Sequence, residues 1–338
     1  MKMKLAVVAS LAVVACMGMV AQVPQAEIKN AKLHAKVYLP DPKNGFYKGT
    51  RFDYSGVITD LEVAGHHLYQ PWFTGRDATA RDFNFAGDAI NVGINSAMVG
   101  PVEEFQKPQG FDTAKAGETF VKIGVGVLRK GDDPVYQFGK HFDMVDAGTW
   151  TTRKTPSSVT FQQTLGTAQS PYAYVYTKTV RFVGNESKMV IEHSLKNVGT
   201  MALQTNVYDH NFLTIDGLPV GSDYSITVPY SVKSTRAPDV KYIKMEGNKA
   251  EYIADVTGEN RVAWNMSGYS DSPKDYDFTI VNKKAQLAIN ITGDRPLANA
   301  NIWSIRSVMA VEPFIAVSAE PGKEFTWSYT YTYTDLSK

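Results

Sequence analysis

Apolar and polar residues alternate in short runs along most of the chain, and sustained helical periodicity is scarce. The clearest run is Phe325–Thr334, where aromatic residues alternate with threonine and serine. Met189–Lys196 alternates in the same way. A period of two places successive side chains on opposite faces of a strand, so each run has one face for a core and one for solvent. The pattern predicts an all-β protein.

Other extended runs are separated by Gly, Pro, Asn and Asp at intervals near about ten residues, which is typical of antiparallel sandwich sheets. They predict strands at Lys32–Leu39, Phe120–Leu128, Trp150–Lys154, Ser158–Thr164, Ala173–Val183, Ser225–Tyr230, Lys241–Ile253, Tyr276–Val281, Gln286–Ile291 and Asn301–Glu312. No biased linker or internal repeat divides the chain. We therefore expect residues 27–338 to form a single β-sandwich domain.

Ala80–Gly110 is the least regular part of the chain and is rich in glycine and asparagine. Long irregular segments in a β protein often line a site. Glu103 and Glu104 lie in this segment and are candidates for recognising hydroxyl groups. A solvated acidic turn is the preferred interpretation of the pair.

The N-terminus has the pattern of a secretory signal: Lys2 and Lys4 precede the apolar run Leu5–Val14, and small residues follow. The apolar run is short for a membrane span. We expect residues 1–26 to be a signal peptide, cleaved after Ala21 or Ala26. Alternatively, a lipoprotein signal ends before Cys16, and this cysteine carries a lipid anchor. Either outcome places the protein outside the cytoplasm, in the periplasm or on the cell envelope.

The charges are balanced, with 35 basic and 34 acidic residues and no long run of either sign, so no nucleic-acid partner is expected. Cys16 is the only cysteine. This excludes a disulfide framework and a cysteine-based metal site or nucleophile. The sequence also lacks the spaced motifs of zinc hydrolases, calcium loops and nucleophile elbows, so we expect no cofactor and no metal.

Two short stretches carry the candidate chemistry. His210 stands among aromatic and amide side chains in Tyr208–Phe212, where a strand is expected to end, and Glu312 ends another apolar strand just before Pro313. A proline removes one donor from the ladder of a sheet. A histidine and a glutamate can together move protons on a neutral substrate near pH 7. We expect them to face each other across a gap about as wide as a pyranose ring.

Several segments resemble the galactose mutarotase (aldose 1-epimerase) superfamily. Asn197–Thr200 and Tyr208–Phe212 resemble the superfamily's "N-x-G … x-H-x-Y/F" segment. Ile302–Ser304, Met309–Pro313 and Glu320–Trp327 are similar to its C-terminal "VW … CVEP … PG-x-x-x-x-W" pattern. Order and spacing agree over the C-terminal half of the chain.

This resemblance implies a galactose mutarotase-like β-supersandwich of large antiparallel sheets, with a small sugar or glycan end as the partner. It implies that His210 is the general acid for the ring oxygen and that Glu312 is the general base for the anomeric hydroxyl. Asp275 resembles the sugar-binding aspartate of the family, with Asp277 as a near alternative. Trp303 is a further candidate for the binding site, although core packing also explains it.

The sequence departs from the family pattern at two points. Gly93–Ser96 lacks the arginine of an Asn-Arg motif, and Gly110–Asp112 has aspartate where a second histidine is usual. Arg51 and His141 are the candidates to replace the two missing side chains. Two functions therefore stay open: an exported aldose 1-epimerase-like isomerase, or a non-catalytic carbohydrate-binding protein of the cell envelope. A structural protein of the envelope is a third alternative.

Overall fold

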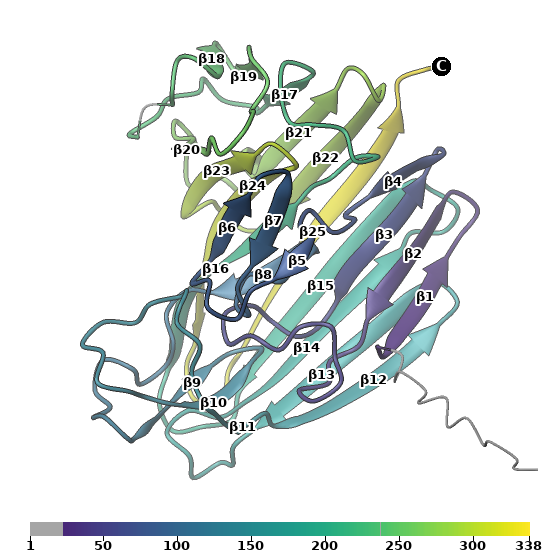
Figure 1. Ribbon diagram of the computed structural model, residues 1–338. Coiled ribbons are helices and arrows are strands. Elements are labelled where there is room, and N and C mark those ends of the chain that lie inside the picture. Colours follow the sequence, from purple (N-terminus) through teal and green to yellow (C-terminus); the bar gives the residue numbers. More distant parts are fainter. Residues whose placement is uncertain (1–22, 237) are drawn as a thin grey trace, which may run out of the picture.

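The computed structural model describes residues 23–236 and 238–338 (Figure 1). Strands and their connecting loops make up this part of the chain, and its one helical element is the short 3-10 turn η1 (Pro273–Asp275). The prediction of an all-β protein is confirmed. The signal peptide and Cys16 lie outside the described residues, except for the last positions of the expected 1–26 segment.

The largest sheet has ten strands, all antiparallel to their neighbours. Its order is β12 (Thr149–Thr155), β13 (Ser158–Leu165), β14 (Tyr174–Phe182), β15 (Lys188–Asn197), β25 (Glu324–Asp335), β22 (Leu287–Gly293), β21 (Asp277–Asn282), β17 (Tyr224–Thr227), β19 (Lys249–Tyr252) and β18 (Ile243–Glu246). The two clearest alternating runs of the sequence, β15 and β25, pair with each other near its middle. The sheet thus places sequence-distant strands side by side.

A five-stranded antiparallel sheet packs against the ten-stranded one. Its order is β20 (Val262–Asn265), β23 (Asn299–Ile305), β24 (Val308–Ala319), β16 (Leu203–Phe212) and β8 (Gly100–Phe105). Three smaller sheets complete the fold. They are β1 (Gln25–Lys29), β2 (Leu33–Tyr38), β3 (Val57–Val63) and β4 (His66–Leu68); β9 (Thr119–Lys122), β10 (Gly126–Arg129) and β11 (Met144–Asp146); and β5 (Gly75–Arg76), β7 (Ala89–Val92) and β6 (Phe83–Ala86).

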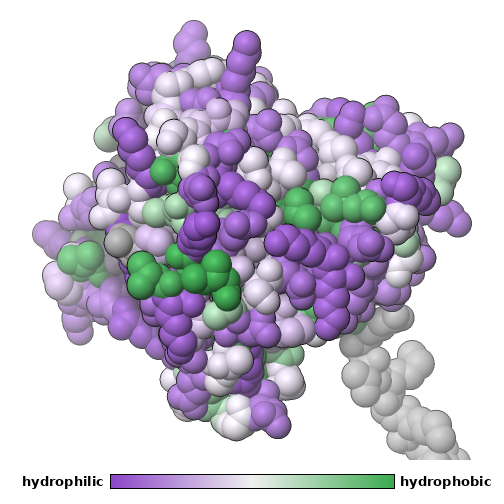
Figure 2. All heavy atoms as spheres, turned by 90° about the horizontal axis from the view of Figure 1, so that it is seen from above, coloured by the Kyte–Doolittle hydropathy of each residue, from purple (hydrophilic) through white to green (hydrophobic). Residues whose placement is uncertain are grey.

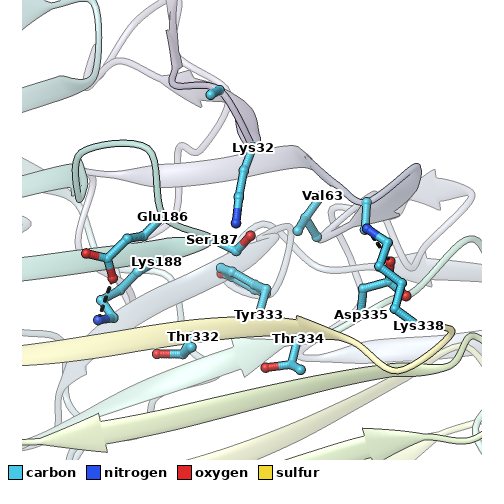
Figure 3. A pocket seen from close by; sticks show the side chains of 12 residues that line it. Lys32, Val63, Glu186, Ser187, Lys188, Thr332, Tyr333, Thr334, Asp335 and Lys338 are labelled. Carbon is cyan, nitrogen blue, oxygen red and sulfur yellow. Dashed lines mark hydrogen bonds and ion pairs between the residues drawn. The ribbon is translucent and has the colours of Figure 1, made fainter.

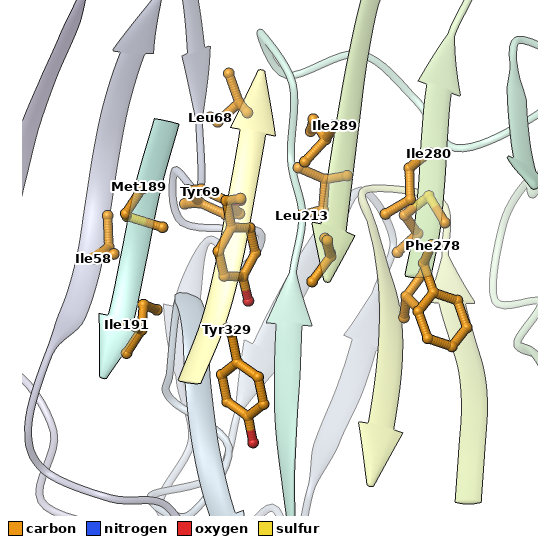
Figure 4. Close-up of a cluster of buried hydrophobic side chains, with 14 of the residues drawn as sticks. Ile58, Leu68, Tyr69, Met189, Ile191, Leu213, Phe278, Ile280, Ile289 and Tyr329 are labelled. Carbon is orange, nitrogen blue, oxygen red and sulfur yellow. The ribbon is translucent and has the colours of Figure 1, made fainter. Parts of the chain in front are cut away.

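The main core fills the space between the sheets (Figure 4). Ile191 on β15 and Tyr329 on β25 point into it from the ten-stranded sheet, and Leu213 enters from the end of β16. Ile58 on β3 belongs to the same core. The alternation read from the sequence therefore corresponds to one buried and one solvated face of the large sheet.

A second core lies on the opposite face of the five-stranded sheet, beneath the small sheet β5–β7–β6. Trp72, Phe83 and Phe212 are buried there together with Phe52. We call this small sheet the flap. The flap and the loops beside it cover the outer face of β16 and β24, where the candidate residues lie.

Three of the predicted single strands are hairpins of two strands: Phe120–Leu128 corresponds to β9 and β10, Lys241–Ile253 to β18 and β19, and Asn301–Glu312 to β23 and β24. The prediction of one strand is wrong for each of them. In the last of the three, the chain reverses after Ile305. Glu312 therefore lies inside β24 and does not end it. Pro313 does interrupt a ladder of the sheet. The pairing of β16 with β24 runs to Tyr208↔Phe314 and stops before Pro313.

The irregular segment Ala80–Gly110 contains three strands, β6, β7 and β8. Glu103 and Glu104 do not form a solvated turn, because both lie in β8 and both side chains are buried. They point to opposite faces of the five-stranded sheet, as neighbours on a strand must. Glu103 faces the main core and Glu104 faces the outer side.

The surface view shows small apolar groups scattered over a mostly hydrophilic face (Figure 2). The exposed large apolar side chains of the described residues include Val135 and Phe138 in one loop and Val240 in another. Across residues 23–236 and 238–338, no helix has the length and apolar character needed to cross a membrane.

Candidate active site

His210 on β16 and Glu312 on β24 occupy facing positions on neighbouring strands. The pairing Tyr208↔Phe314 and the bridge Leu213↔Met309 lie on either side of them in one register. Side chains at facing positions of an antiparallel pair are close neighbours. His210 Nε2 consequently lies 3.1 Å from Glu312 Oε1.

The expected gap between the two groups is absent, because adjacent strands bring them into direct contact. Both side chains nevertheless line one cavity of about 130 Å³ on the outer face of the five-stranded sheet. The residues themselves are only 5% and 9% exposed. A substrate would therefore sit over the pair and could not separate the two groups.

Aromatic side chains hold the imidazole of His210 in place. Its ring stacks on Phe212 with centroids 3.7 Å apart and packs edge to face with Phe52 at a centroid distance of 5.7 Å. Trp303 meets it edge to face at 5.9 Å. Among the described residues, Nδ1 of His210 has no hydrogen-bond partner. Aromatic packing therefore orients this histidine, and not a hydrogen bond from Nδ1 to a carboxylate.

Arg51 lies beside the pair, and two neighbours fix its guanidinium. Its Nε donates to Glu104 Oε2 at 2.6 Å, and its Nη2 donates to the hydroxyl of Tyr208 at 2.9 Å. Tyr208 in turn donates to Glu104. The guanidinium also lies 4.3 Å from the ring centroids of both Phe52 and Phe138. Sequence position alone suggested Arg51, and the structure places it in the cavity wall.

Opposite shifts in pKa act on the two candidate residues. Burial lowers the pKa of His210 well below its usual value, and the positive charge of Arg51 lowers it further. Burial raises the pKa of Glu312 to about 7, with Arg51 opposing this shift and Glu104 adding to it. Both shifts favour the neutral forms. Near neutral pH, the pair can therefore hold one proton on Glu312.

Asp82 and Ser96 supply the polar part of the opposite wall. Ser96 Oγ donates to Asp82 Oδ1 at 2.5 Å, and the same oxygen lies 4.0 Å from Arg51 Nη1. Both residues come from the segment that the sequence marks as irregular. Its glycine and asparagine content indicated a loop around a site, but no local motif singled out these two side chains.

The remaining lining residues are aromatic, and the sequence does not identify most of them. The walls include Trp72, Phe83 and Phe212, with Phe138 at the edge, and Trp303 lines the cavity as expected. Trp303 also packs on Trp72 and Phe83, as the alternative of core packing predicted. Aromatic residues make up 12% of the chain, so the sequence does not distinguish the few that surround this cavity.

Two of the sequence candidates lie elsewhere. Asp275 is in η1 and accepts hydrogen bonds from the backbone and hydroxyl of Ser270, and it does not line the cavity. Its alternative Asp277 accepts from Asn290 on the large sheet. His141 is exposed and does not line the cavity, and its Nδ1 lies 3.4 Å from Asn95 Oδ1. The structure thus brings Arg51 and Trp303 to the His210–Glu312 pair, but neither Asp275 nor His141.

A larger groove of about 610 Å³ lies at the end of β25 and contains none of these groups (Figure 3). Lys188 in its wall pairs with Glu186, and Lys338 pairs with Asp335. Size alone would favour this groove, but two of its three lysines are already paired with carboxylates, and it contains neither His210 nor Glu312. In the described ranges, no group of three or more His, Cys, Asp or Glu side chains could hold a metal ion.

No known family profile matches the sequence. No curated protein matches it either. Solved structures do match the fold. A candidate aldose 1-epimerase from Escherichia coli K12 superposes with a TM-score of 0.55 at 12% identity, covering 93% of this chain and 100% of the other.

A galactose mutarotase related enzyme from Lactobacillus acidophilus has a TM-score of 0.51 at 12% identity, with 93% and 98% of the two chains covered. A galactose mutarotase-like protein from Clostridium acetobutylicum gives 0.52 at 12% identity, with 92% and 95% covered. Identities this low establish the fold alone. The chain has the galactose mutarotase-like β-supersandwich fold.

Proposed function

We propose that this protein is an aldose 1-epimerase-type isomerase that interconverts the anomers of a sugar by acid–base ring opening. The contact between His210 and Glu312 inside one aromatic cavity carries the proposal. Opening a cyclic hemiacetal removes a proton from the anomeric hydroxyl and adds one to the ring oxygen. Both oxygens are bonded to the same carbon, so two proton-transfer groups in contact can serve both.

The single proton of the pair is enough for the reaction. Glu312, protonated in the empty site, donates to the ring oxygen, while neutral His210 accepts the proton of the anomeric hydroxyl. The family resemblance implied the opposite assignment, with His210 as the acid. Nitrogen-15 NMR of His210 at pH 7 distinguishes the two, because our assignment predicts a neutral imidazole and the other predicts an imidazolium ion.

The walls fit a neutral sugar. Asp82 and Ser96 can accept and donate hydrogen bonds to hydroxyl groups, and Trp72 and Trp303 offer apolar surface to the ring carbons. Arg51 is the one cation of the lining, and Glu104 already neutralises it. An anionic sugar such as a phosphosugar would find no free positive charge in these walls.

Anomer exchange tests the proposal directly. We expect the protein to accelerate the exchange of α and β anomers of at least one aldose, measured by polarimetry or NMR exchange. Glu312→Gln and His210→Asn should each lower the rate by at least about 10²-fold, because each removes a proton-transfer group. Equal rates for the wild type and Glu312→Gln would reject an isomerase.

A non-catalytic sugar-binding protein is the second candidate. It is favoured by the absence of Asp275 and His141 from the cavity lining, because the family resemblance implied an aspartate and a second histidine there. Sugar binding detected by calorimetry, together with unaccelerated exchange for every bound sugar, would select this function.

We also propose that the protein is exported. Strand β1 begins at Gln25, and Ala26 is buried and pairs with Val37. Cleavage after Ala26 would remove the first two residues of this strand, whereas cleavage after Ala21 leaves it whole. N-terminal sequencing of the secreted protein should therefore begin at Gln22, and a lipid-modified Cys16 would contradict this.

A further inference from the structure

Phe138 is the one aromatic side chain of the described residues that is exposed. The other Phe, Tyr and Trp side chains in these residues are buried or half-buried. Phe138 is 45% exposed, and it also lines the cavity above His210 and Glu312. The exposed aromatic ring therefore lies at the mouth of the candidate site.

The ring of Phe138 is held in position by its surroundings. The Arg51 guanidinium lies 4.3 Å from its centroid and the same distance from Phe52, so one face of the ring is covered. Asn95 Nδ2 donates to the carbonyls of Phe138 and Lys140, at 2.9 and 2.8 Å. Asn95 is itself buried and accepts from the backbone of Thr50. The backbone of Phe138 is thus anchored, and its ring is supported on one face.

The cavity below this ring is small. At about 130 Å³ it falls short of the roughly 300–1,000 Å³ of typical ligand pockets, so it can take at most one sugar ring. A ligand with a second ring would have to extend past the mouth. Phe138 is the apolar surface at that point, beside Arg51 and Asp82.

We infer that Phe138 forms a second subsite, and that the ligand is the reducing end of an oligosaccharide with at least two sugar units. This inference rests on the proposed function. The reducing-end ring enters the cavity with its anomeric carbon over His210 and Glu312. The next ring lies at the mouth and packs its C–H face on Phe138. An apolar aromatic surface beside hydrogen-bonding groups suits a sugar ring, which presents both C–H faces and hydroxyl edges.

Calorimetric titration with matched sugars tests the inference. The probes are glucose, galactose, mannose and xylose, and their α- and β-1,4-linked disaccharides with the same sugar at the reducing end. A disaccharide should bind wild-type protein about 3- to 10-fold more tightly than its monosaccharide, as expected for one aromatic contact. Phe138→Ala should bring this ratio to near one, and Phe138→Trp should preserve it.

Val135→Ala is the matched control, because Val135 is on the same loop, is 66% exposed and does not line the cavity. It should leave the ratio unchanged. The inference is overturned if disaccharides bind no more tightly than monosaccharides, or if Phe138→Ala weakens both equally. A change of oligomeric state in Phe138→Ala, measured by light scattering, would also overturn it by making Phe138 an interface residue.

Exchange rates measured with the same sugars separate this inference from the proposed function. Disaccharide binding that depends on Phe138 without anomer exchange supports the subsite and rejects the isomerase. Exchange without any preference for disaccharides supports the isomerase and rejects the subsite. Failure of every sugar to bind rejects both.

Discussion

The proton shared by His210 and Glu312 makes the site sensitive to pH near neutrality. The pair holds one proton between the lowered pKa of His210 and the Glu312 pKa of about 7. Above that range Glu312 loses its proton and no acid is left for the ring oxygen. After subtraction of the uncatalysed reaction, the exchange rate should be level between the lowered pKa of His210 and about pH 7, and should fall about tenfold per pH unit above pH 7. A rate that stays level to pH 9 would contradict this assignment.

Glu104 sets the charge that Glu312 experiences. It neutralises Arg51, is also 3.3 Å from Lys122, and by its negative charge helps to raise the pKa of Glu312. In Glu104→Gln the cation of Arg51 is less compensated, so the pKa of Glu312 should fall. The alkaline limb of the pH–rate profile should then move to lower pH.

The same substitution should cost stability. Breaking a buried ion pair on one side leaves the other charge unpaired and costs about 3–5 kcal/mol. The double variant Arg51→Gln/Glu104→Gln removes both charges and should recover part of that loss. Denaturant unfolding measures both effects. A Glu104→Gln protein as stable as the wild type would show that neither Arg51 nor Lys122 depends on Glu104.

At the scale of elements, the flap is positioned by a close backbone approach. A Cβ at Gly93 would lie 2.0 Å from the carbonyl oxygen of Ala80, and the Gly93 amide donates to the Asp82 carbonyl at 2.7 Å. Gly93→Ala should therefore push the segment that carries Asp82 out of place. We expect a loss of about 2 kcal/mol or more in the free energy of unfolding, with weaker sugar binding.

Gly87→Ala is the matched control in the same flap. Gly87 lies in the β6–β7 turn with a φ of +62° and no atom within 4 Å of an added Cβ. It should lose only the about 1 kcal/mol of a left-handed backbone, without an effect on binding. Equal losses in the two variants would show that the contact at Gly93 does not position the flap.

The strands also differ in how well the sequence predicts them. Strands such as β15 and β25 were predictable, because one face is buried and the other is solvated, and alternation records that difference. β8 was not predictable from alternation, because both of its faces are covered. The main core covers one face and the outer loops cover the other, so Glu103 and Glu104 are both buried. His210 and Glu312 were found through their flanking motifs. Asp82 and Phe138 were missed because long-range contacts, not local pattern, place them at the cavity.

At the scale of the whole molecule, buried charges join the two large sheets. Glu103 on β8 forms an ion pair with Lys178 on β14, and its other oxygen lies 2.6 Å from His193 Nε2 on β15. Burial opposes the charge of Glu103, but Lys178 and His193 hold its pKa at about 2. Truncating Lys178 to Met should therefore cost about 3–5 kcal/mol, measured by denaturant unfolding, because Glu103 and Asp53 would stay buried without a cation. A loss below about 1 kcal/mol would contradict this role.

Asp209 faces Glu103 across the β8–β16 ladder and has the opposite protonation state. Burial, together with the charge of Glu103, raises the pKa of Asp209 to about 8. The hydroxyl of Tyr331 is in hydrogen-bond contact with both Asp209 Oδ2 and Asn211 Oδ1, the latter at 2.7 Å. Because the hydroxyl has one proton to donate, we infer that protonated Asp209 donates to Tyr331 and that Tyr331 donates to Asn211. Asn211 Nδ2 donates to the carbonyl of Val311 at 2.8 Å, where Pro313 has interrupted the ladder. This chain of bonds ties β25 to the strands that carry His210 and Glu312.

The protonation of Asp209 predicts how stability depends on pH. Its pKa is raised from 3.8 in the unfolded chain to about 8 in the fold, so its contribution is complete below pH 3.8 and is lost as the pH rises to about 8. Asp209→Asn has no proton to lose, and its amide can still donate to Tyr331. Relative to the wild type, the variant should gain about 1.4 kcal/mol per pH unit between about pH 5 and 7.5, and no more above about pH 8.

Thermal unfolding across this pH range measures the difference in stability between Asp209→Asn and the wild type. Asp132→Asn is the control, because Asp132 is exposed. The control should track the wild type at every pH, because other buried groups titrate equally in both proteins. A constant difference between Asp209→Asn and the wild type would mean that Asp209 is ionised in the fold. Tyr331 would then have two acceptors and only one proton, so either Asp209 or Asn211 would lack its partner. That outcome would remove the support that the large sheet gives to the strands of the site.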